Sequence, residues 1–165
     1  MNRVFCGLGS NLGDREAHLR QALGQLARRA DPVRISSLYE SEPVGGPEQP
    51  RYLNAVVELA TGLEPEDLLA ECQALEVAAG RIRAVRWGPR PLDLDVLWYD
   101  GRVMVSPRLV LPHPRAAVRR FVLEPWCEIW PMGSLRGQSL IRLLDDVQDQ
   151  PVWLWKKAEQ WIAAR

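Results

Sequence analysis

Two aspartates stand two positions apart in residues 86–99, which read Arg-Trp-Gly-Pro-Arg-Pro-Leu-Asp-Leu-Asp-Val-Leu-Trp-Tyr. Side chains alternate between the faces of a β-strand, so Asp93 and Asp95 would project from one face with their Cα atoms about 6.5–7 Å apart. Mg²⁺ prefers one or two carboxylates together with water and substrate phosphates. Arg86 and Arg90, in the loop before this strand, would supply positive charge facing the phosphates. The segment therefore predicts a site for metal ions and a polyphosphate.

The two aspartates could instead be solvent-facing residues of a half-exposed strand. Asp is uncommon in strands, however, and two like charges on one face repel each other unless a positive group lies between them. The alternating Leu92, Leu94 and Val96 would point the other way, into a core. The pattern favours metal-assisted transfer of a phosphoryl-type group by positioning and electrostatics. No Ser-His-Asp or Cys-His set has a recognisable spacing, so nothing in the sequence supports covalent catalysis.

Charges are segregated along the chain although its formal net charge is zero. Residues 35–79 contain nine acidic residues and one basic residue, Arg51, whereas residues 81–120 contain nine arginines. Nineteen of the 21 basic residues are arginine, whose planar guanidinium can bind two phosphate oxygens at once. Zero net charge argues against a general nucleic-acid or membrane surface. The arginine-rich stretch predicts a local site for a polyanion.

Size and composition predict one globular domain over residues 1–165. The chain has 165 residues, and 47% of them are hydrophobic, which is ample for a packed core. There is no apolar run of about 18 residues, and the first residues lead at once into an apolar strand rather than a signal sequence. The three cysteines are scattered without metal-ligand spacing, which is typical of reduced core residues. We therefore expect a cytoplasmic protein.

Hydrophobic periodicity predicts an α+β fold. The expected elements are strands over 3–8, 33–41, 52–60 and 92–99, helices over about 19–30 and 65–79, and a short strand over 103–105 after an Asp100-Gly101 hairpin signal. The βαββαβ order indicates a ferredoxin-like sandwich with an added C-terminal strand and helices. In the tail, Trp155, Ala158 and Ile162 recur at helical spacing, and its tryptophans either pack on the domain or form a dimer contact. The loop over 43–50, with three prolines and two glycines, could be a lid, and 81–91 is a second long loop.

Other polar residues have both a structural and a ligand-binding interpretation. Residues 7–13 read Gly-x-Gly-x-x-x-Gly, which fits a tight strand-to-helix turn better than a nucleotide motif. Asn54 lies inside an apolar strand and either caps an edge or binds a flat heterocycle. Gln73 and Glu76 share one helix face, where surface polarity explains them nearly as well as binding. His113, held between two prolines, is either a phosphate contact or a structural turn.

Five ordered motifs resemble the 6-hydroxymethyl-7,8-dihydropterin pyrophosphokinase family, an enzyme family of folate biosynthesis, over about residues 3–130. The signature over 86–96 is supported by motifs over 9–13, 49–54, 80–83 and 111–115, the last followed by residues 119–123. The resemblance implies transfer of the β,γ-pyrophosphoryl group of ATP to the hydroxymethyl oxygen of the pterin, with release of AMP. It also implies two Mg²⁺ ions held by Asp93 and Asp95.

The resemblance assigns the remaining positions to the two substrates. Tyr52 and Phe121 would sandwich the pterin ring, and Asn54 would bind its hydrogen-bonding edge. The other pterin-binding positions would be Gly9, Asn11, Val44 and Gly45. The ATP-binding positions would be Gln73, Glu76, Arg83, Trp87, Arg90, Val96, Arg108, His113 and Arg119. Arg81 and Arg90 would act with the two aspartates in catalysis, and Trp87 would belong to a loop that closes over the substrates and excludes water.

Two other functions use the same features. A ferredoxin-like RNA-binding module has the same order of elements, but it needs exposed aromatic residues and a basic face where this chain has the two aspartates. A Mg²⁺-dependent phosphohydrolase would use the same carboxylates with water as the acceptor, and a clamp of Tyr52, Asn54 and Phe121 would distinguish the transferase from it. We expect small-molecule substrates, no nucleic-acid or membrane partner, and a monomer.

Overall fold

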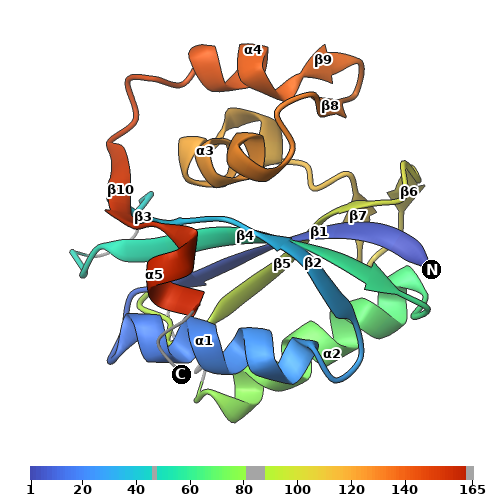
Figure 1. The fold of residues 1–165 in the computed structure, drawn as a ribbon, viewed down its shortest axis with the longest axis horizontal. Coiled ribbons are helices and arrows are strands. Elements are labelled where there is room, and N and C mark those ends of the chain that lie inside the picture. Colours follow the sequence, from blue (N-terminus) through green and yellow to red (C-terminus); the bar gives the residue numbers. More distant parts are fainter. Residues whose placement is uncertain (46–47, 81–87, 163–165) are drawn as a thin grey trace.

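The protein is built on a six-stranded antiparallel sheet with helices on both faces (Figure 1). The computed structural model describes residues 1–45, 48–80 and 88–162. The strands of the sheet are β1 (Asn2–Ser10), β2 (Asp31–Ile35), β3 (Leu38–Ser41), β4 (Tyr52–Thr61), β5 (Asp93–Tyr99) and β10 (Val152–Lys156). The strand order is β10-β3-β4-β1-β5, with β2 also paired to β4. The mixed architecture of helices around an antiparallel sheet is confirmed.

The second predicted strand is divided in two. β2 and β3 both pair with β4, and they are separated by Ser36 and Ser37. The Ser36 hydroxyl accepts a hydrogen bond from Val56 N (2.9 Å), and Ser37 N donates to the Glu128 carboxylate (3.0 Å). Side chains therefore take over the backbone bonds at this break, which lets the chain bend without leaving buried amides unpaired.

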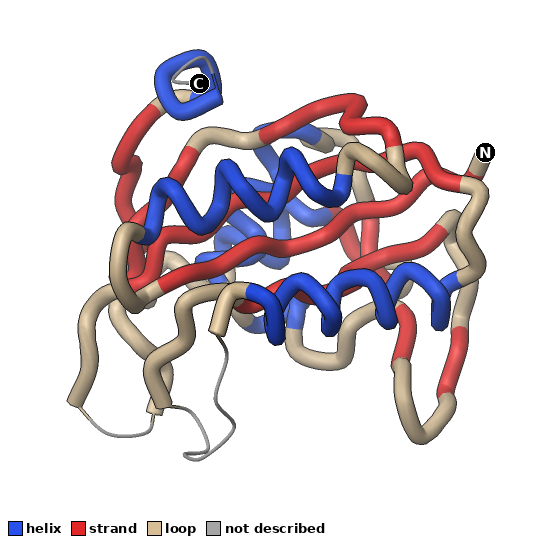
Figure 2. Tube along the Cα trace, turned by 90° about the horizontal axis from the view of Figure 1, so that it is seen from below, coloured by secondary structure: helices blue, strands red, loops and turns tan. Residues whose placement is uncertain are grey.

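One face of the sheet is covered by α1 (Arg15–Leu26) and α2 (Pro65–Ala78), which lie side by side in front of it in Figure 2. Helix α1 begins where the Asp14 carboxylate accepts a hydrogen bond from Ala17 N, a typical N-cap. Helix α2 begins with Pro65, which the first turn of a helix tolerates. Leu19 and Leu68 are fully buried beneath the two helices, in the larger core cluster.

The opposite face is covered by the segment after β5. It contains the short 3-10 helix η1 (Ala116–Val118), α3 (Arg120–Ile129), the hairpin β8–β9 (Ser134–Leu135 and Gln138–Ser139) and α4 (Leu140–Asp145) (Figure 1). Phe5 of β1 faces this layer and stacks on Trp130, with ring centroids 4.8 Å apart. Trp126 is fully buried in the same cluster. The two core clusters therefore lie on opposite faces of one sheet.

The tail is half strand and half helix. β10 pairs with β3, and the chain then crosses to the α1 side, where α5 (Ala158–Ile162) buries Trp161. The helical spacing therefore applies only from Ala158 onward, because Trp155 belongs to β10 and is 45% exposed. The indole of Trp161 donates to Ser36 O (2.9 Å), and Lys156 forms an ion pair with Glu16 of α1 (2.9 Å).

The Asp100-Gly101 turn forms as predicted, with positive φ at both residues. Its expected return strand, β6 (Met104–Val105), pairs instead with β7 (Val110–Leu111). This small hairpin leads the chain back past β5 to His113. Within the described part of the chain, no helix has both the length and the apolar character needed to cross a membrane.

Candidate active site

A cavity of about 590 Å³ opens where β1 ends and β4 and β5 begin, beside α2 and the start of α3. Most of the sequence-predicted site residues line it. They are Gly9, Val44, Tyr52, Asn54, Gln73, Glu76, Arg90, Asp93, Asp95, His113, Arg119 and Phe121. Segments that are far apart in the sequence are therefore brought to one cavity.

Some predicted positions lie elsewhere. Asn11, Gly45, Val96 and Arg108 are described but do not line the cavity. Val96 is buried in the larger core cluster, and Arg108 is exposed. The predictions for Arg81, Arg83, Arg86 and Trp87 fall outside the described residues.

Glycines in β1 create the floor of the cavity. The strand register places Gly9 between Asn54 on β4 and Asp93 on β5, and Gly7 between Val56 and Asp95. A side chain at Gly9 would bring a Cβ to 3.5 Å from the Tyr52 ring and 3.6 Å from Asn54 Oδ1. Both glycines lie inside β1 rather than in a strand-to-helix turn, which corrects that interpretation of the Gly-x-Gly motif.

The predicted same-face placement of the two aspartates agrees with the register of β5. Burial, followed by the charges of Asp93 and Glu76, raises the pKa of Asp95 to about 7. Arg119 and Arg90 oppose that rise, and Arg90 Nη1 contacts Asp93 Oδ1 at 3.2 Å. Negative charge is thus concentrated on one strand face, with positive charge beside it.

This donor set fits Mg²⁺. Asp93 and Asp95 offer carboxylate oxygens, the ligands that Mg²⁺ prefers, and both border a cavity with room for phosphate groups. Glu76 lies nearby with 3% of its surface exposed, and its carboxylate accepts a hydrogen bond from Leu94 N (2.9 Å). A divalent cation would relieve the repulsion that raises the pKa of Asp95.

His113 faces the aspartates in its neutral form. Burial, followed by the nearby Arg119 guanidinium, lowers the pKa of His113 to about 4. Its Nδ1 accepts a hydrogen bond from Arg115 N (3.2 Å), so the neutral ring carries its proton on Nε2. Nε2 lies 3.9 Å from Asp95 Oδ1. The ring can therefore donate one hydrogen bond into the cavity.

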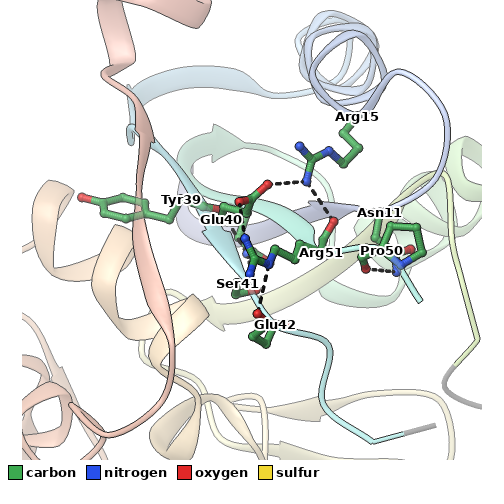
Figure 3. Close-up of polar contacts among 9 residues, drawn as sticks. Asn11, Arg15, Tyr39, Glu40, Ser41, Glu42, Pro50 and Arg51 are labelled. Carbon is green, nitrogen blue, oxygen red and sulfur yellow. Dashed lines mark hydrogen bonds and ion pairs between the residues drawn. The ribbon is translucent and has the colours of Figure 1, made fainter. Parts of the chain in front are cut away.

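Asn11 joins the two loops beside the cavity. Its Nδ2 donates to Gln49 Oε1 (2.8 Å) and to Pro50 O (3.0 Å), the second of which is drawn in Figure 3. Its Oδ1 accepts from Arg90 N (2.8 Å). Only 1% of Asn11 is exposed. The residue thus contacts the loops that border the cavity.

An ion-pair network fixes the start of β4. Arg15 Nη1 donates to Glu40 Oε2 (2.8 Å) and to Arg51 O (2.9 Å), while Arg51 Nε donates to Glu42 (3.0 Å) (Figure 3). The Arg51 guanidinium also lies over the ring of Trp153 in β10, 4.7 Å from its centroid. These contacts hold the chain immediately before Tyr52.

Sequence reasoning missed some of the cavity lining. Gly7, Ser41 and Arg115 line the cavity without having been given a role. Gly7 had a detectable signal, because Gly-x-Gly inside an apolar strand places two missing side chains on one face. The position of Ser41 had no such signal, since it depends on the pairing of β3 with β4.

Comparison with known proteins identifies the family. Residues 5–131 match the family model described as 7,8-dihydro-6-hydroxymethylpterin-pyrophosphokinase (HPPK). The chain is 45% identical over 158 residues to the 2-amino-4-hydroxy-6-hydroxymethyldihydropteridine pyrophosphokinase of Bacillus subtilis (strain 168), covering 94% of this chain and 92% of the relative. It is 42% identical over 147 residues to the enzyme of the same name from Pseudomonas aeruginosa, covering 87% and 91%.

Solved structures show the same fold. A wild-type Plasmodium falciparum HPPK-DHPS matches with a TM-score of 0.71 at 12% identity, covering 88% of this chain and 44% of that one. An HPPK-DHPS in complex with substrates matches with a TM-score of 0.70 at 10% identity, covering 88% and 43%. The chain thus spans less than half the length of these two. On the match of residues 5–131 and the identities to its relatives, the chain belongs to the 7,8-dihydro-6-hydroxymethylpterin-pyrophosphokinase family.

Proposed function

We propose that the cavity is the active site in which this chain transfers pyrophosphate from ATP to 6-hydroxymethyl-7,8-dihydropterin and releases AMP. Such a transfer would serve folate biosynthesis, which appears in the names of two further relatives, the folic acid synthesis protein fol1 of Pneumocystis carinii and the folate synthesis bifunctional protein of Arabidopsis thaliana. The observation that carries the proposal is the strand register, which sets Asp93 beside Gly9 and Asn54 in one row across three strands. A carboxylate site and an amide that can bind a heterocycle therefore share one floor.

The pterin would lie at the Asn54 end of this row. Asn54 Nδ2 donates to Ser41 Oγ (2.8 Å) and to Tyr39 O (3.2 Å), so Oδ1 is the carboxamide atom beside Gly9. An acceptor in that place suits the amino group of a pterin. Tyr52 and Phe121 line the same cavity and would stack on the ring.

The ATP phosphates would lie at the aspartate end. Asp93 and Asp95 would hold two Mg²⁺ ions, and Gln73 and Glu76 would lie nearer the nucleoside. Bound there, the ions would neutralise phosphate charge and orient the pterin hydroxyl toward the β-phosphorus. Arg90 and Arg119 would bind phosphate oxygens, and neutral His113 would donate its Nε2 proton in a hydrogen bond.

The protein's part in the reaction is positioning and charge stabilisation. A bond forms between the pterin oxygen and the β-phosphorus, and the bond from the β-phosphorus to the α,β-bridging oxygen breaks, so that AMP leaves with that oxygen. The hydroxyl proton is released to solvent over the turnover. Guanidinium groups placed in advance stabilise charge on the group in transfer, and an acceptor held in line avoids the entropic cost of a bimolecular encounter. Loops on either side would keep water out, so that the pterin rather than water is the acceptor.

The finer description of the fold is also a proposal. The order β5-β1-β4-β2/β3 with two helices on one face supports a ferredoxin-like sandwich. The two core clusters on opposite faces of one sheet support a single domain over residues 1–165. The three free cysteines are consistent with a reducing cytoplasm. A monomer remains a prediction.

The reaction can be tested with purified protein, Mg²⁺ and ATP. We expect AMP to form only when 6-hydroxymethyl-7,8-dihydropterin is added, in equal amount to the diphosphorylated pterin. AMP that forms without the pterin would indicate a hydrolase, and no AMP in either reaction would refute the proposal.

A further inference from the structure

We propose that Gln150, in the segment between α4 and β10, is a positioning residue that holds Arg119 and Phe121 in place for the two substrates. The inference rests on the proposed function, in which Arg119 binds phosphate and Phe121 stacks on the pterin. Gln150 is 29 positions beyond Phe121, in a part of the chain for which the sequence motifs give no role.

The carboxamide of Gln150 bridges the backbone on either side of Arg119. Its Nε2 donates to Val118 O (2.8 Å), and its Oε1 accepts from Arg120 N (2.9 Å). Val118 is the last residue of η1 and Arg120 the first of α3, so one side chain caps both helices. Arg119 between them has an extended backbone with φ −117° and ψ 110°.

The N-cap residues of η1 and α3, Arg115 and Arg119, make no side-chain capping hydrogen bond. The N–H groups of a helix's first turn need acceptors, and Gln150 supplies one from a distant part of the chain. Without Gln150, the residues on either side of Arg119 lose two hydrogen bonds, and Arg119 keeps only its backbone bonds to Ala116, Val122 and Leu123. The side chains that reach the cavity on either side of this junction would then vary in position.

The side chain of Arg120 in turn binds the backbone of the segment that carries Gln150. Its Nη1 donates to Gln150 O (2.9 Å) and to Gln148 O (3.1 Å), while its Nε and Nη2 bind Glu124 Oε1 (3.2 and 3.0 Å). The Arg120 guanidinium therefore points away from the substrate cavity, toward the C-terminal segment. The two neighbouring arginines thus have different roles, since Arg119 lines the cavity and Arg120 binds the segment between α4 and β10.

One side of the junction between η1 and α3 borders open space. A second cavity of about 520 Å³ adjoins the first, bounded by Val44, Val118, Pro151 and neighbouring residues, and Val118 is 61% exposed. On this side the hydrogen bonds from Gln150 support the junction, whereas Ala116 and Leu123 pack into the core on the other side. Gln150 is itself held, because its N–H donates to the carbonyl of Val147 (3.1 Å), which is buried in the core.

The test compares Gln150→Ala with Gln148→Ala. Gln148 lies in the same segment, and its side chain donates to Leu144 O in the preceding helix α4 (3.0 Å) rather than to the junction between η1 and α3. We expect Gln150→Ala to lower kcat/KM about tenfold by misplacing substrate-binding groups, while Gln148→Ala stays within about twofold of wild type. Equal values for the two variants would overturn the proposal.

A double-mutant cycle separates positioning from general destabilisation. If Gln150 acts on nucleotide binding through Arg119, Gln150→Ala should weaken the binding of Mg²⁺ and α,β-methylene-ATP less than about twofold further in an Arg119→Ala background. A full tenfold loss in that background would show a purely structural role and overturn the proposal. Should Gln150→Ala fail to fold, Gln150→Glu, which keeps the acceptor for Arg120 N, takes its place in the cycle.

A binding measurement keeps this proposal separate from the proposed function. Titration calorimetry with Mg²⁺ and α,β-methylene-ATP should show about tenfold weaker binding to Gln150→Ala than to Gln148→Ala, whether or not the wild type makes AMP. An inactive wild type would refute the pyrophosphokinase proposal alone. Equal nucleotide affinity of the two variants would refute the role of Gln150.

Discussion

Asn11 and Arg90 bind each other through two hydrogen bonds, one from Asn11 N to Arg90 O (3.0 Å) and one from Arg90 N to Asn11 Oδ1 (2.8 Å). The other end of the Asn11 carboxamide binds Gln49 and Pro50. One buried side chain therefore connects the loop before β4 with the loop before β5. A movement of one loop would strain the bonds that hold the other.

Asn11→Ala should raise the KM of both substrates, because it releases both loops at once. It should also lower the free energy of unfolding by about 2 kcal/mol, since the buried partners of the carboxamide lose their bonds. Steady-state kinetics and urea unfolding would measure the two effects. The matched control is Asn2→Ala, which removes a hydrogen bond to Tyr99 Oη (2.8 Å) in another part of the molecule. KM values as unperturbed as those of the control would contradict the link between the loops.

Gly9→Ala should weaken pterin binding without unfolding the protein. The added Cβ would make ordinary contacts at 3.5 and 3.6 Å with Tyr52 and Asn54, but it would occupy the floor between Asn54 and Asp93. We expect the KM for the pterin to rise about tenfold and the KM for ATP to change less. Gly24→Ala in α1, where a Cβ meets nothing within 4 Å, is the control. A parallel rise in both KM values would argue against a pterin site at Gly9.

Asp95→Asn should lower kcat at least about 100-fold, because it removes a charged ligand from the proposed metal site. It should not destabilise the fold, since burial and neighbouring carboxylates already disfavour the charged form and raise the pKa of Asp95 to about 7. Adding Mg²⁺ and an ATP analogue should raise the Tm of wild type more than that of the variant. Asp100→Asn, in an exposed turn, controls for loss of a carboxylate. A kcat near that of wild type would rule out Asp95 as a metal ligand.

The ion pair between Lys156 and Glu16 should make the docking of the tail depend on pH. Burial tends to raise the pKa of Glu16, but hydrogen bonds from Lys156 and Arg20 outweigh it and lower the pKa below the ordinary 4.5. A lowered pKa in the folded state stabilises the fold above pH 4.5, and this stabilisation is lost as the pH falls through the folded-state value. Lys156→Gln should therefore cost about 0.5–1 kcal/mol at pH 7 and less at pH 3.

Urea unfolding at both pH values would measure this difference. Lys157→Gln, at the exposed neighbouring position, is the control for loss of a positive charge. An equal cost of Lys156→Gln at pH 7 and pH 3 would show that its partner is not Glu16.

The parts of the fold that follow from local periodicity could be predicted from the sequence. The helical pattern around Leu19 and Leu68 and the alternation in β4 and β5 correspond to elements in the structure. The break between β2 and β3 could not be predicted, because it depends on Glu128, which is 91 positions from Ser37. The strand in the tail was obscured for a similar reason, since β10 is stabilised by pairing with β3.

The same distinction holds at the candidate site. The two-residue spacing of Asp93 and Asp95 is local, so their shared face was predictable from the sequence. The pairing of Gly9 with Asp93 and of Gly7 with Asp95 depends on the register between β1 and β5, which the sequence does not specify locally. Gln150 had no signal, because its side chain contacts only become apparent once α4 has returned the chain to α3.

The bond from Trp161 to Ser36 joins residues 125 positions apart, and the pair of Lys156 with Glu16 joins residues 140 apart. Contacts of such long range form slowly, because the chain loses loop entropy before it gains their energy. During synthesis the β10–α5 segment would leave the ribosome only after the other strands of the sheet. We therefore expect nascent chains to expose the unpaired edge of β3 for a time, which makes that edge a place where chaperones or aggregation partners would bind first.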